Sequence, residues 1–238
     1  MPEALRKQGR RRAGWLRDYL DRLLRRDAAD ITRVSPELLR RTMDLLAAEQ
    51  SSEFVAAHLA RFLGGSESSA MTYVDKLRAL YLVESIPAWS RSRTQRAVRK
   101  PKMIVADSGL AAELAGLDEE LLLSPTGAVH LGGALEGFVA GELVRQQTWS
   151  RTDYTISHFR ESGGAEVDLL LELRGGKVLG IEVKATSSPG RQHASGLVRL
   201  KDRLGADVLG GIVLHAGNRS FSMGEGIWAV PVPALWQL

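Results

Sequence analysis

The sequence contains no cysteine, and this absence excludes several kinds of site. Without thiols, a chain of 238 residues cannot form a disulfide framework, a thiolate zinc site or a cysteine nucleophile. The chain also lacks any uninterrupted apolar run of about 18 residues, and its Arg-rich start has no apolar segment behind it, so we expect neither a membrane span nor a signal peptide. Internal repeats and low-complexity tracts are absent too. The sequence therefore predicts a cytoplasmic protein with no membrane partner.

Basic residues are concentrated in two segments, although the formal net charge is only +4. The first segment, residues 6–26, has nine Lys or Arg residues against two acidic ones, and its leucines recur at helical spacing. This pattern predicts a basic amphipathic helix in a helical linker over residues 1–34. Its arginine face is either solvated, with the helix packed on the rest of the chain, or in contact with nucleic acid or a membrane surface.

Residues 35–106 have the element order of a winged-helix domain. Ser35 and Pro36 predict a capped helix start, a second helix follows from residue 52, and a third covers residues 66–80. Strands are expected over residues 81–86 and 102–106. On the third helix we expect Met71, Val74, Leu77 and Leu80 to face inward and Lys76 to face outward.

The second basic segment lies between these two strands. Residues 90–100 contain no acid and five basic residues, which are Arg91, Arg93, Arg96, Arg99 and Lys100. In a winged helix the third helix enters the major groove and the wing reaches the backbone, so these side chains and Lys76 are candidates for contacts with phosphate groups. The alternative is a protein-interaction module with a solvated hairpin.

A linker helix is expected over residues 107–128, and a second domain over residues 129–238. The helix over residues 131–146 carries Glu142 inside its apolar stripe and Glu136 on the edge of that stripe. A buried acid requires a cation, an arginine or hydrogen-bond donors beside it. One or both glutamates should therefore have such a partner.

A hairpin follows, with strands over residues 166–173 and 177–184. If Arg174, Gly175 and Gly176 form a three-residue turn, Asp168 lies opposite Glu182, and Lys184 lies on the same face. A two-residue turn would instead point the two carboxylates to opposite sides. We favour the three-residue turn, because glycine at its last position accepts the left-handed conformation. Opposed carboxylates need neutralising, and a hard cation such as Mg²⁺ does this with oxygen ligands.

Asp168, followed 14 residues later by Glu182-Val183-Lys184 on a strand, with the helical Glu136 upstream, resembles the PD-(D/E)XK nuclease superfamily. The later helix (residues 190–204) and apolar strand (residues 208–215) fit its α-β-β-β-α-β order. This resemblance implies that Asp168 and Glu182 hold a catalytic Mg²⁺ or Mn²⁺ ion, that Lys184 orients the attacking water or stabilises the phosphate, and that Glu136 supports a metal. Glu142 remains an alternative to Glu136, and the other reading of the strand is a solvated, half-buried face.

Nearly the whole chain is also similar to the C-terminal region of a family of prokaryotic AAA-type ATPases, in which a winged-helix segment precedes a nuclease-like tail. The residues that carry this likeness include Arg12 with Trp15, Asp107-Ser108-Gly109, and Gly164 to Asp168. The chain contains no G-x-x-x-x-G-K-[ST] motif, so ATP hydrolysis is not carried over. We expect a fragment or a stand-alone remnant, with any ATPase supplied as a partner.

The sequence therefore predicts an α/β protein in which a basic helix and a winged helix-turn-helix unit precede a restriction-endonuclease-like core. Its expected function is DNA binding with a Mg²⁺-dependent phosphodiesterase site. Arg160 is a further candidate for a phosphate contact. The alternative is a catalytically inactive DNA-binding or assembly module of an ATPase, or of a homo-oligomer.

Overall fold

The computed structural model describes the chain apart from residues 1, 32–33, 125, 162–163 and 238, and it does not describe the side chains of residues 2, 27–31 and 93. The chain forms two compact units. The first unit comprises Met1–Ser85 and Met103–Gly137, and the second comprises Ile86–Lys102 and Phe138–Leu238. Within the described ranges, no helix combines the length and the apolar character needed to cross a membrane.

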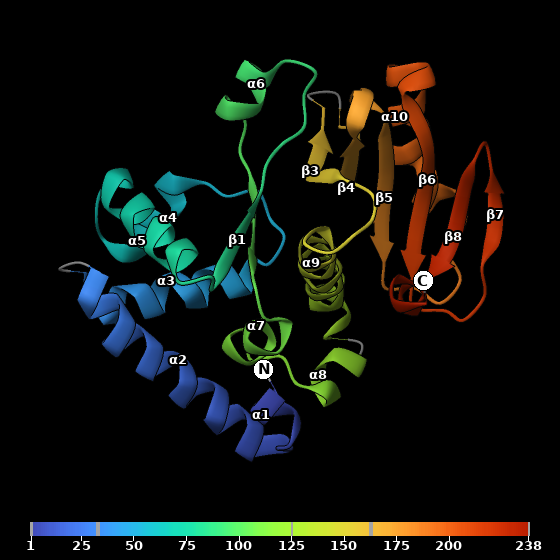
Figure 1. Cartoon of the computed structure of the whole chain (residues 1–238). Helices are drawn as coiled ribbons and strands as arrows, with labels where there is room; N and C mark the ends of the chain where they lie inside the picture. Colours follow the sequence, from blue (N-terminus) through green and yellow to red (C-terminus); the bar gives the residue numbers. More distant parts are fainter. Residues whose placement is uncertain (1, 32–33, 125, 162–163, 238) are drawn as a thin grey trace. The chain divides into compact units, whose positions relative to one another are not determined.

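The first unit is mainly helical (Figure 1). Its helices are α1 (Pro2–Leu5), α2 (Gly9–Ile31), α3 (Pro36–Ala48), α4 (Ala56–Leu63), α5 (Glu67–Ala79), α7 (Ser108–Leu114), α8 (Glu119–Leu123) and the first half of α9 (Ala128–Gln147). Strands β1 (Val83–Ile86) and β2 (Lys102–Val105) pair in a two-stranded sheet. The expected order of three helices followed by two strands is therefore present over residues 36–105.

Helix α2 is the amphipathic helix that the sequence predicts. Leu16, Leu20 and Leu24 are buried in the core of the first unit. On its other faces, Arg17 forms an ion pair of 2.7 Å with Glu113, and Asp21 one of 3.0 Å with Arg40. The helix therefore packs on the rest of the first unit through its leucines, while most of its described basic side chains are exposed.

Helix α5 confirms the expected third helix but corrects its inward face. Its first turn is capped by the hydroxyl of Ser66, which accepts a hydrogen bond from the amide of Ser69. Val74 and Leu77 are buried as expected, whereas Met71 is 37% exposed and the smaller Ala70 is buried in its stead. The apolar stripe therefore runs one residue earlier at the start of the helix.

The second unit contains a mixed six-stranded sheet in the order β3-β4-β5-β6-β8-β7 (Figure 1). Strand β5 pairs antiparallel with β4 and parallel with β6. The strands are β3 (Tyr154–Arg160), β4 (Glu166–Leu173), β5 (Val178–Lys184), β6 (Val208–His215), β7 (Phe221–Gly224) and β8 (Ile227–Pro231). Short 3-10 turns are η1 (Arg174–Gly176), η2 (Arg191–Ala194), η3 (Gly205–Asp207) and η4 (Val232–Trp236).

Helix α10 (Ser195–Leu204) packs closely on this sheet because two strand glycines leave room for its leucines. Gly180 and Gly211 are neighbours on β5 and β6. A Cβ atom on Gly180 would lie 2.5 Å from Leu197 Cδ2, and one on Gly211 would lie 2.9 Å from Leu197 Cδ1. Glycine within a strand often marks such a close approach.

The segment between β1 and β2 belongs to the second unit, although its residues predict the wing of a winged-helix domain. It contains the short helix α6 (Arg93–Val98). The Arg96 guanidinium binds the Glu172 carboxylate on β4 through two hydrogen bonds, of 2.6 and 3.0 Å, and Trp89 contacts Phe159 on β3 at 6.1 Å between ring centroids. These contacts, with partners more than 60 residues away in sequence, bind the segment to the sheet.

Candidate active site

The hairpin of β4 and β5 places Asp168 and Glu182 together. The backbone pairs Leu169 with Ile181, and the amide of Leu173 donates to the carbonyl of Lys177 at 2.8 Å. The backbone pairing of the two strands ends at the first of these pairs, and Asp168 and Glu182 are the next residues beyond it on β4 and β5. In the turn, Gly175 and Gly176 adopt φ values of 84° and 76°. The three-residue turn expected from the sequence is therefore confirmed, along with the left-handed glycine that it requires.

Lys184 bridges the two carboxylates. Its Nζ atom lies 2.6 Å from Oε2 of Glu182 and 3.3 Å from Oδ2 of Asp168. The same Asp168 oxygen accepts a hydrogen bond of 2.8 Å from the amide of Val183. The Asp168, Glu182 and Lys184 side chains, called the carboxylate-lysine cluster below, thus meet at the ends of two neighbouring strands.

Both carboxylates are inside the protein. Asp168 is 8% exposed and Glu182 is 5% exposed, and β5 is buried on both of its faces. The alternative of a solvated, half-buried strand is therefore wrong for this strand. It fails because β5 lies between β4 and β6, with α10 packed over it.

Burial changes the proton affinity of the cluster. Desolvation raises the pKa of Glu182 to about 8, and the charge of Asp168 adds to this effect while Lys184 opposes it. Burial acts to lower the pKa of Lys184, but Asp168 and Glu182 outweigh it, so this pKa is raised. Below about pH 8 the folded protein therefore holds a proton on Glu182, and Lys184 stays charged over the whole neutral range.

Gly196 allows α10 to approach the cluster, a role that the sequence analysis missed. A Cβ atom at this position would lie 2.1 Å from the carbonyl oxygen of Glu166 and 2.6 Å from Oε1 of Glu182. A larger residue would displace the carboxylate or the helix. A glycine in the interior of the helix predicted over residues 190–204 was the available signal, since glycine costs roughly 1 kcal/mol relative to alanine there and needs a packing reason.

The donor set fits a hard divalent cation. Mg²⁺ and Mn²⁺ prefer oxygen ligands, and a Mg²⁺ site usually combines one or two carboxylates with waters and substrate oxygens. Asp168 and Glu182 provide such a pair, and their mutual repulsion would be relieved by the cation. Within the described ranges, no group of three or more His, Asp or Glu side chains is arranged around a common point, so other ligands would come from water, backbone or substrate.

The two helical glutamates lie in different units. Glu142 belongs to the second unit, and its carboxylate binds Arg145 at 2.9 Å and the indole Nε1 of Trp236 at 3.0 Å. Burial acts to raise the pKa of Glu142, but the hydrogen bonds from Arg145, Trp236 and Gln146 lower it. The expected partner for a buried acid on this helix is therefore found at Glu142. Glu136 is half-buried in the first unit, and its metal role stays a prediction.

The basic residues proposed for nucleic-acid contact are largely engaged within the chain. Arg96 binds Glu172 as described above, Arg91 forms an ion pair of 2.8 Å with Asp207, and Arg99 donates to the carbonyl of Arg160 at 2.9 Å. Lys100 is exposed in the second unit and Lys76 is half-buried in the first, while the side chain of Arg93 lies outside the described residues. Contact of these residues with nucleic acid stays a prediction.

The comparisons with known proteins assign the chain to a family of unknown function. Residues 1–121 match the model described as Domain of unknown function (DUF8612), which is about half of the chain. The chain belongs to this family. Residues 131–235 match a second model, described as Domain of unknown function (DUF4143).

Two curated relatives match across both regions. Uncharacterized proteins of Mycobacterium bovis and Mycobacterium tuberculosis are each 31% identical to this chain over 223 residues, which is 92% of this chain and 47% of the relative. The chain thus spans about half the length of the curated relatives that it matches. No solved structure matches the chain.

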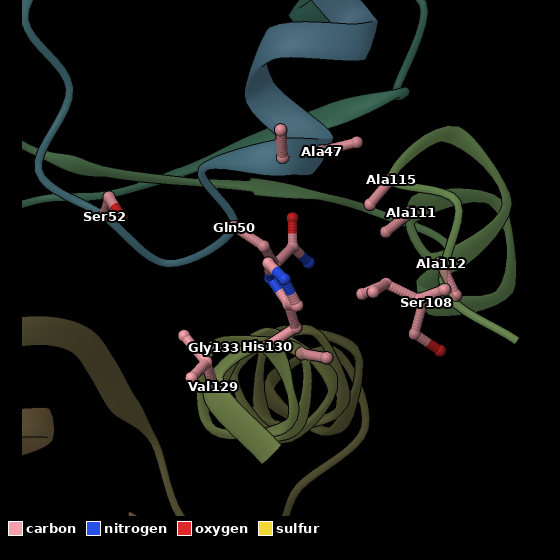
Figure 2. A pocket seen from close by; sticks show the side chains of 13 residues that line it. Ala47, Gln50, Ser52, Ser108, Ala111, Ala112, Ala115, Val129, His130 and Gly133 are labelled. Carbon is pink, nitrogen blue, oxygen red and sulfur yellow. The ribbon is translucent and has the colours of Figure 1, made fainter. Parts of the chain in front are cut away.

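Residues of the region that matches DUF8612 and residues of α9 together line a pocket of about 230 Å³ in the first unit. Figure 2 shows small side chains of α3, α7 and α9 around it, with Gln50 and His130 between them. The Gln50 side chain accepts a hydrogen bond of 2.9 Å from the amide of Val105, while its buried Nε2 atom has no hydrogen-bond partner among the described residues. The same Nε2 atom lies 2.3 Å from where a Cβ atom on Gly137 would be, so glycine at this position leaves room for the Gln50 side chain.

Proposed function

We propose that the second unit is a metal-dependent phosphodiesterase acting on nucleic acid, with the carboxylate-lysine cluster as its active site. The observation that carries this proposal is the convergence of two buried carboxylates and one lysine within 2.6 to 3.3 Å. Burying two carboxylates side by side costs free energy unless they bind a cation. Buried ionisable groups with strongly shifted pKa values cluster at functional sites, and Glu182 is such a group.

The division of labour follows from the chemistry of each side chain. Oxygens of Asp168 and Glu182 would hold Mg²⁺ or Mn²⁺, and the bound ion would lower the pKa of a water molecule and offset charge on the phosphate. The amide of Val183 keeps the Asp168 carboxylate in place through its hydrogen bond. With the ion bound, the two carboxylates would no longer need Lys184 to neutralise them. The Lys184 ammonium would then be available to the phosphate or the attacking water.

The surrounding elements support this proposal. The second unit follows the order α9, β3, β4, β5, α10, β6, which is the α-β-β-β-α-β order of the PD-(D/E)XK superfamily that the sequence resembles. In the first unit, three helices and a strand pair have the order of a winged helix, and α5 would be the helix that enters the major groove. DNA is the nucleic acid that this arrangement favours.

Cleavage assays test the proposal. The full chain would be incubated with linear, supercoiled and single-stranded DNA and with Mg²⁺ or Mn²⁺, beside the variants Asp168→Asn and Lys184→Ala. Loss of a metal ligand or of the ammonium should slow cleavage at least about a hundredfold, since each supplies several kcal/mol to the transition state. Asp202→Asn, an exposed carboxylate on α10, is the matched control and should leave the rate unchanged.

Two results would contradict the nuclease proposal. Cleavage at the same rate by the wild type and by Asp168→Asn would place the activity elsewhere or in a contaminant. Absence of cleavage with every DNA form and both metals, together with no Mn²⁺ binding by calorimetry, would remove the metal site as well.

A specific contact favours a second function for the same fold. Lys184 already neutralises the carboxylates at 2.6 and 3.3 Å, which is also how a purely structural ion cluster is satisfied. The chain would then act as a DNA-binding or assembly module of an AAA-type ATPase, as the sequence resemblance implies. Under this alternative, Mn²⁺ does not bind, and Asp168→Asn alters stability alone.

A further inference from the structure

A pocket in the second unit gathers arginines from three separate parts of the chain. Arg91 and Arg99 come from the segment beside α6, Arg160 from the end of β3, and Arg203 from the end of α10. The pocket has a volume of about 480 Å³, and Glu161 is its acidic lining residue. We infer that this arginine pocket binds phosphate groups of a nucleic-acid strand that runs to the carboxylate-lysine cluster, an inference that rests on the function proposed above.

The charges of the pocket favour an anion. Four arginines and one glutamate line it, and Asp207 and Glu166 pair with Arg91 at 2.8 Å and with Arg160 at 3.9 Å. Counting all three acids, one positive charge remains in excess. The acids therefore hold the arginines in place without cancelling the positive charge of the pocket.

The guanidinium groups also retain donors for a ligand. Arg203 pairs with Glu161 through Nε at 2.9 Å, and Arg99 donates to the carbonyl of Arg160 through Nη1. Each guanidinium has five N–H donors in a planar fork that matches the oxygens of a phosphate. Arg203 is 64% exposed in its side chain, so both of its Nη groups have room for such an anion.

Trp89 provides an independent observation at the same place. Its side chain lines the pocket and is only 5% exposed, yet its indole Nε1 has no hydrogen-bond partner among the described residues. A buried donor of this kind is uncommon in proteins and indicates an acceptor that the chain itself does not provide. A phosphate oxygen in the pocket would be such an acceptor after a small movement of the ring.

The position of the pocket identifies a strand of phosphates as the occupant, in preference to a single anion. Arg160 is paired across β3 and β4 with Glu166, which lies two residues before Asp168. Two residues of a β-strand span about 7 Å, which is roughly the rise of two nucleotides along one strand. A nucleic-acid strand bound to Arg160 would therefore reach the carboxylate-lysine cluster within a few phosphates.

Binding measurements on the full chain test this inference. The dissociation constant of a fluorescent single-stranded 20-mer DNA would be measured against NaCl concentration in EDTA, where no cleavage occurs. The double variant Arg99→Ala/Arg203→Ala should flatten the log–log salt slope by about 1.4, because each lost phosphate contact removes about 0.7 for a single strand. Over the tenfold range from 1 M to 0.1 M NaCl, this change in slope amounts to a factor of about 25, so the double variant should bind about 25-fold more weakly at 0.1 M NaCl.

A matched double variant controls for the loss of charge. Arg151→Ala/Arg174→Ala removes two exposed arginines from the same unit, and neither lines the pocket. This control should keep the wild-type slope. Arg203→Lys keeps the charge and should keep the slope while losing part of the affinity, because an ammonium lacks the planar fork. Circular dichroism of each variant would verify that it is folded.

The outcomes separate this inference from the proposed nuclease function. An unchanged slope in Arg99→Ala/Arg203→Ala, or an equal loss in the control pair, would overturn the arginine pocket. Polyglutamate is a second ligand to test. If its binding depends on Arg99 and Arg203 while DNA binding does not, the pocket binds acidic peptides, and the inference of a phosphate site is wrong. If Asp168→Asn and the wild type both fail to cleave while the slope still depends on Arg99 and Arg203, the nuclease proposal fails and the pocket stands.

Discussion

Replacing Glu182 with glutamine should change how the stability of the protein depends on pH. The pKa of Glu182 is raised from 4.5 to about 8 in the folded state, mainly by burial. A group with a raised folded-state pKa contributes stability that is fully present below its unfolded pKa and is lost as pH rises through the folded pKa. Stability should therefore fall between about pH 4.5 and pH 8.

The size of this effect follows from the shift. A difference of about 3.5 pKa units corresponds to about 5 kcal/mol in the free energy of unfolding, at 1.36 kcal/mol per unit. Because Lys184 has its pKa raised above 10.5, it stays charged across this window and adds no slope there. Glu182→Gln cannot ionise, so it should lose this slope and become more stable than the wild type above pH 8.

Urea unfolding of both proteins, followed by tryptophan fluorescence at pH 5 to 9 in EDTA, measures the effect. Asp202→Asn removes an exposed carboxylate from the same unit and should follow the wild-type curve. In buffer without EDTA, adding Mn²⁺ at pH 7 should stabilise the wild type and release about one proton, because a metal displaces the proton held by Glu182. Parallel curves for wild type and Glu182→Gln would refute the raised pKa of the buried Glu182 carboxyl.

Two further predictions concern packing. Gly196→Ala should lower the free energy of unfolding by about 1 to 3 kcal/mol, because its Cβ would lie 2.1 Å from the Glu166 carbonyl oxygen. The control is Gly14→Ala in α2, whose Cβ would meet nothing within 4 Å. This control should stabilise the protein by up to about 1 kcal/mol. Equal melting temperatures for these two variants would show that α10 does not approach the cluster closely. Arg96→Ala should destabilise by about 1 to 3 kcal/mol, since it removes two charge-assisted hydrogen bonds to the Glu172 carboxylate. Arg174→Ala, which removes an exposed ion pair, should change little. Hydrogen exchange of the α6 segment tests this contact. If Arg96→Ala protects the segment as well as the wild type does, the contact does not hold the segment to the sheet.

Local patterns predicted the hairpin because each of its determinants is close in sequence. Apolar and polar residues alternate along β5, and the Arg174-Gly175-Gly176 turn fixes the register, so Asp168 and Glu182 had to share a face. The helix starts after Ser35 and Ser66 could be predicted for the same reason, because the serine side chain accepts a hydrogen bond from an amide only three residues ahead.

Other elements could not be predicted from their own residues. The expectation that Met71 faces inward was wrong, because Ala70 is buried at the start of α5 in its place. Strand β3 and the β7–β8 pair were not assigned from their residues, since short strands at or near sheet edges carry weak patterns and gain stability from their neighbours. The residues of the basic segment between β1 and β2 predict a wing that contacts nucleic acid, and they give no sign of its acidic partners Glu172 and Asp207, which are 76 and 116 residues away.

The sequence by itself determined which residues form the carboxylate-lysine cluster, since strand periodicity and one turn suffice to bring Asp168, Glu182 and Lys184 together. Only the tertiary structure decided the chemical state of that cluster. Packing of β5 between β4 and β6 under α10 removes water from Glu182, and this desolvation raises its pKa to about 8. Tertiary structure likewise assembled the arginine pocket from three distant segments, because long-range packing sets the distances between charges that are remote in sequence.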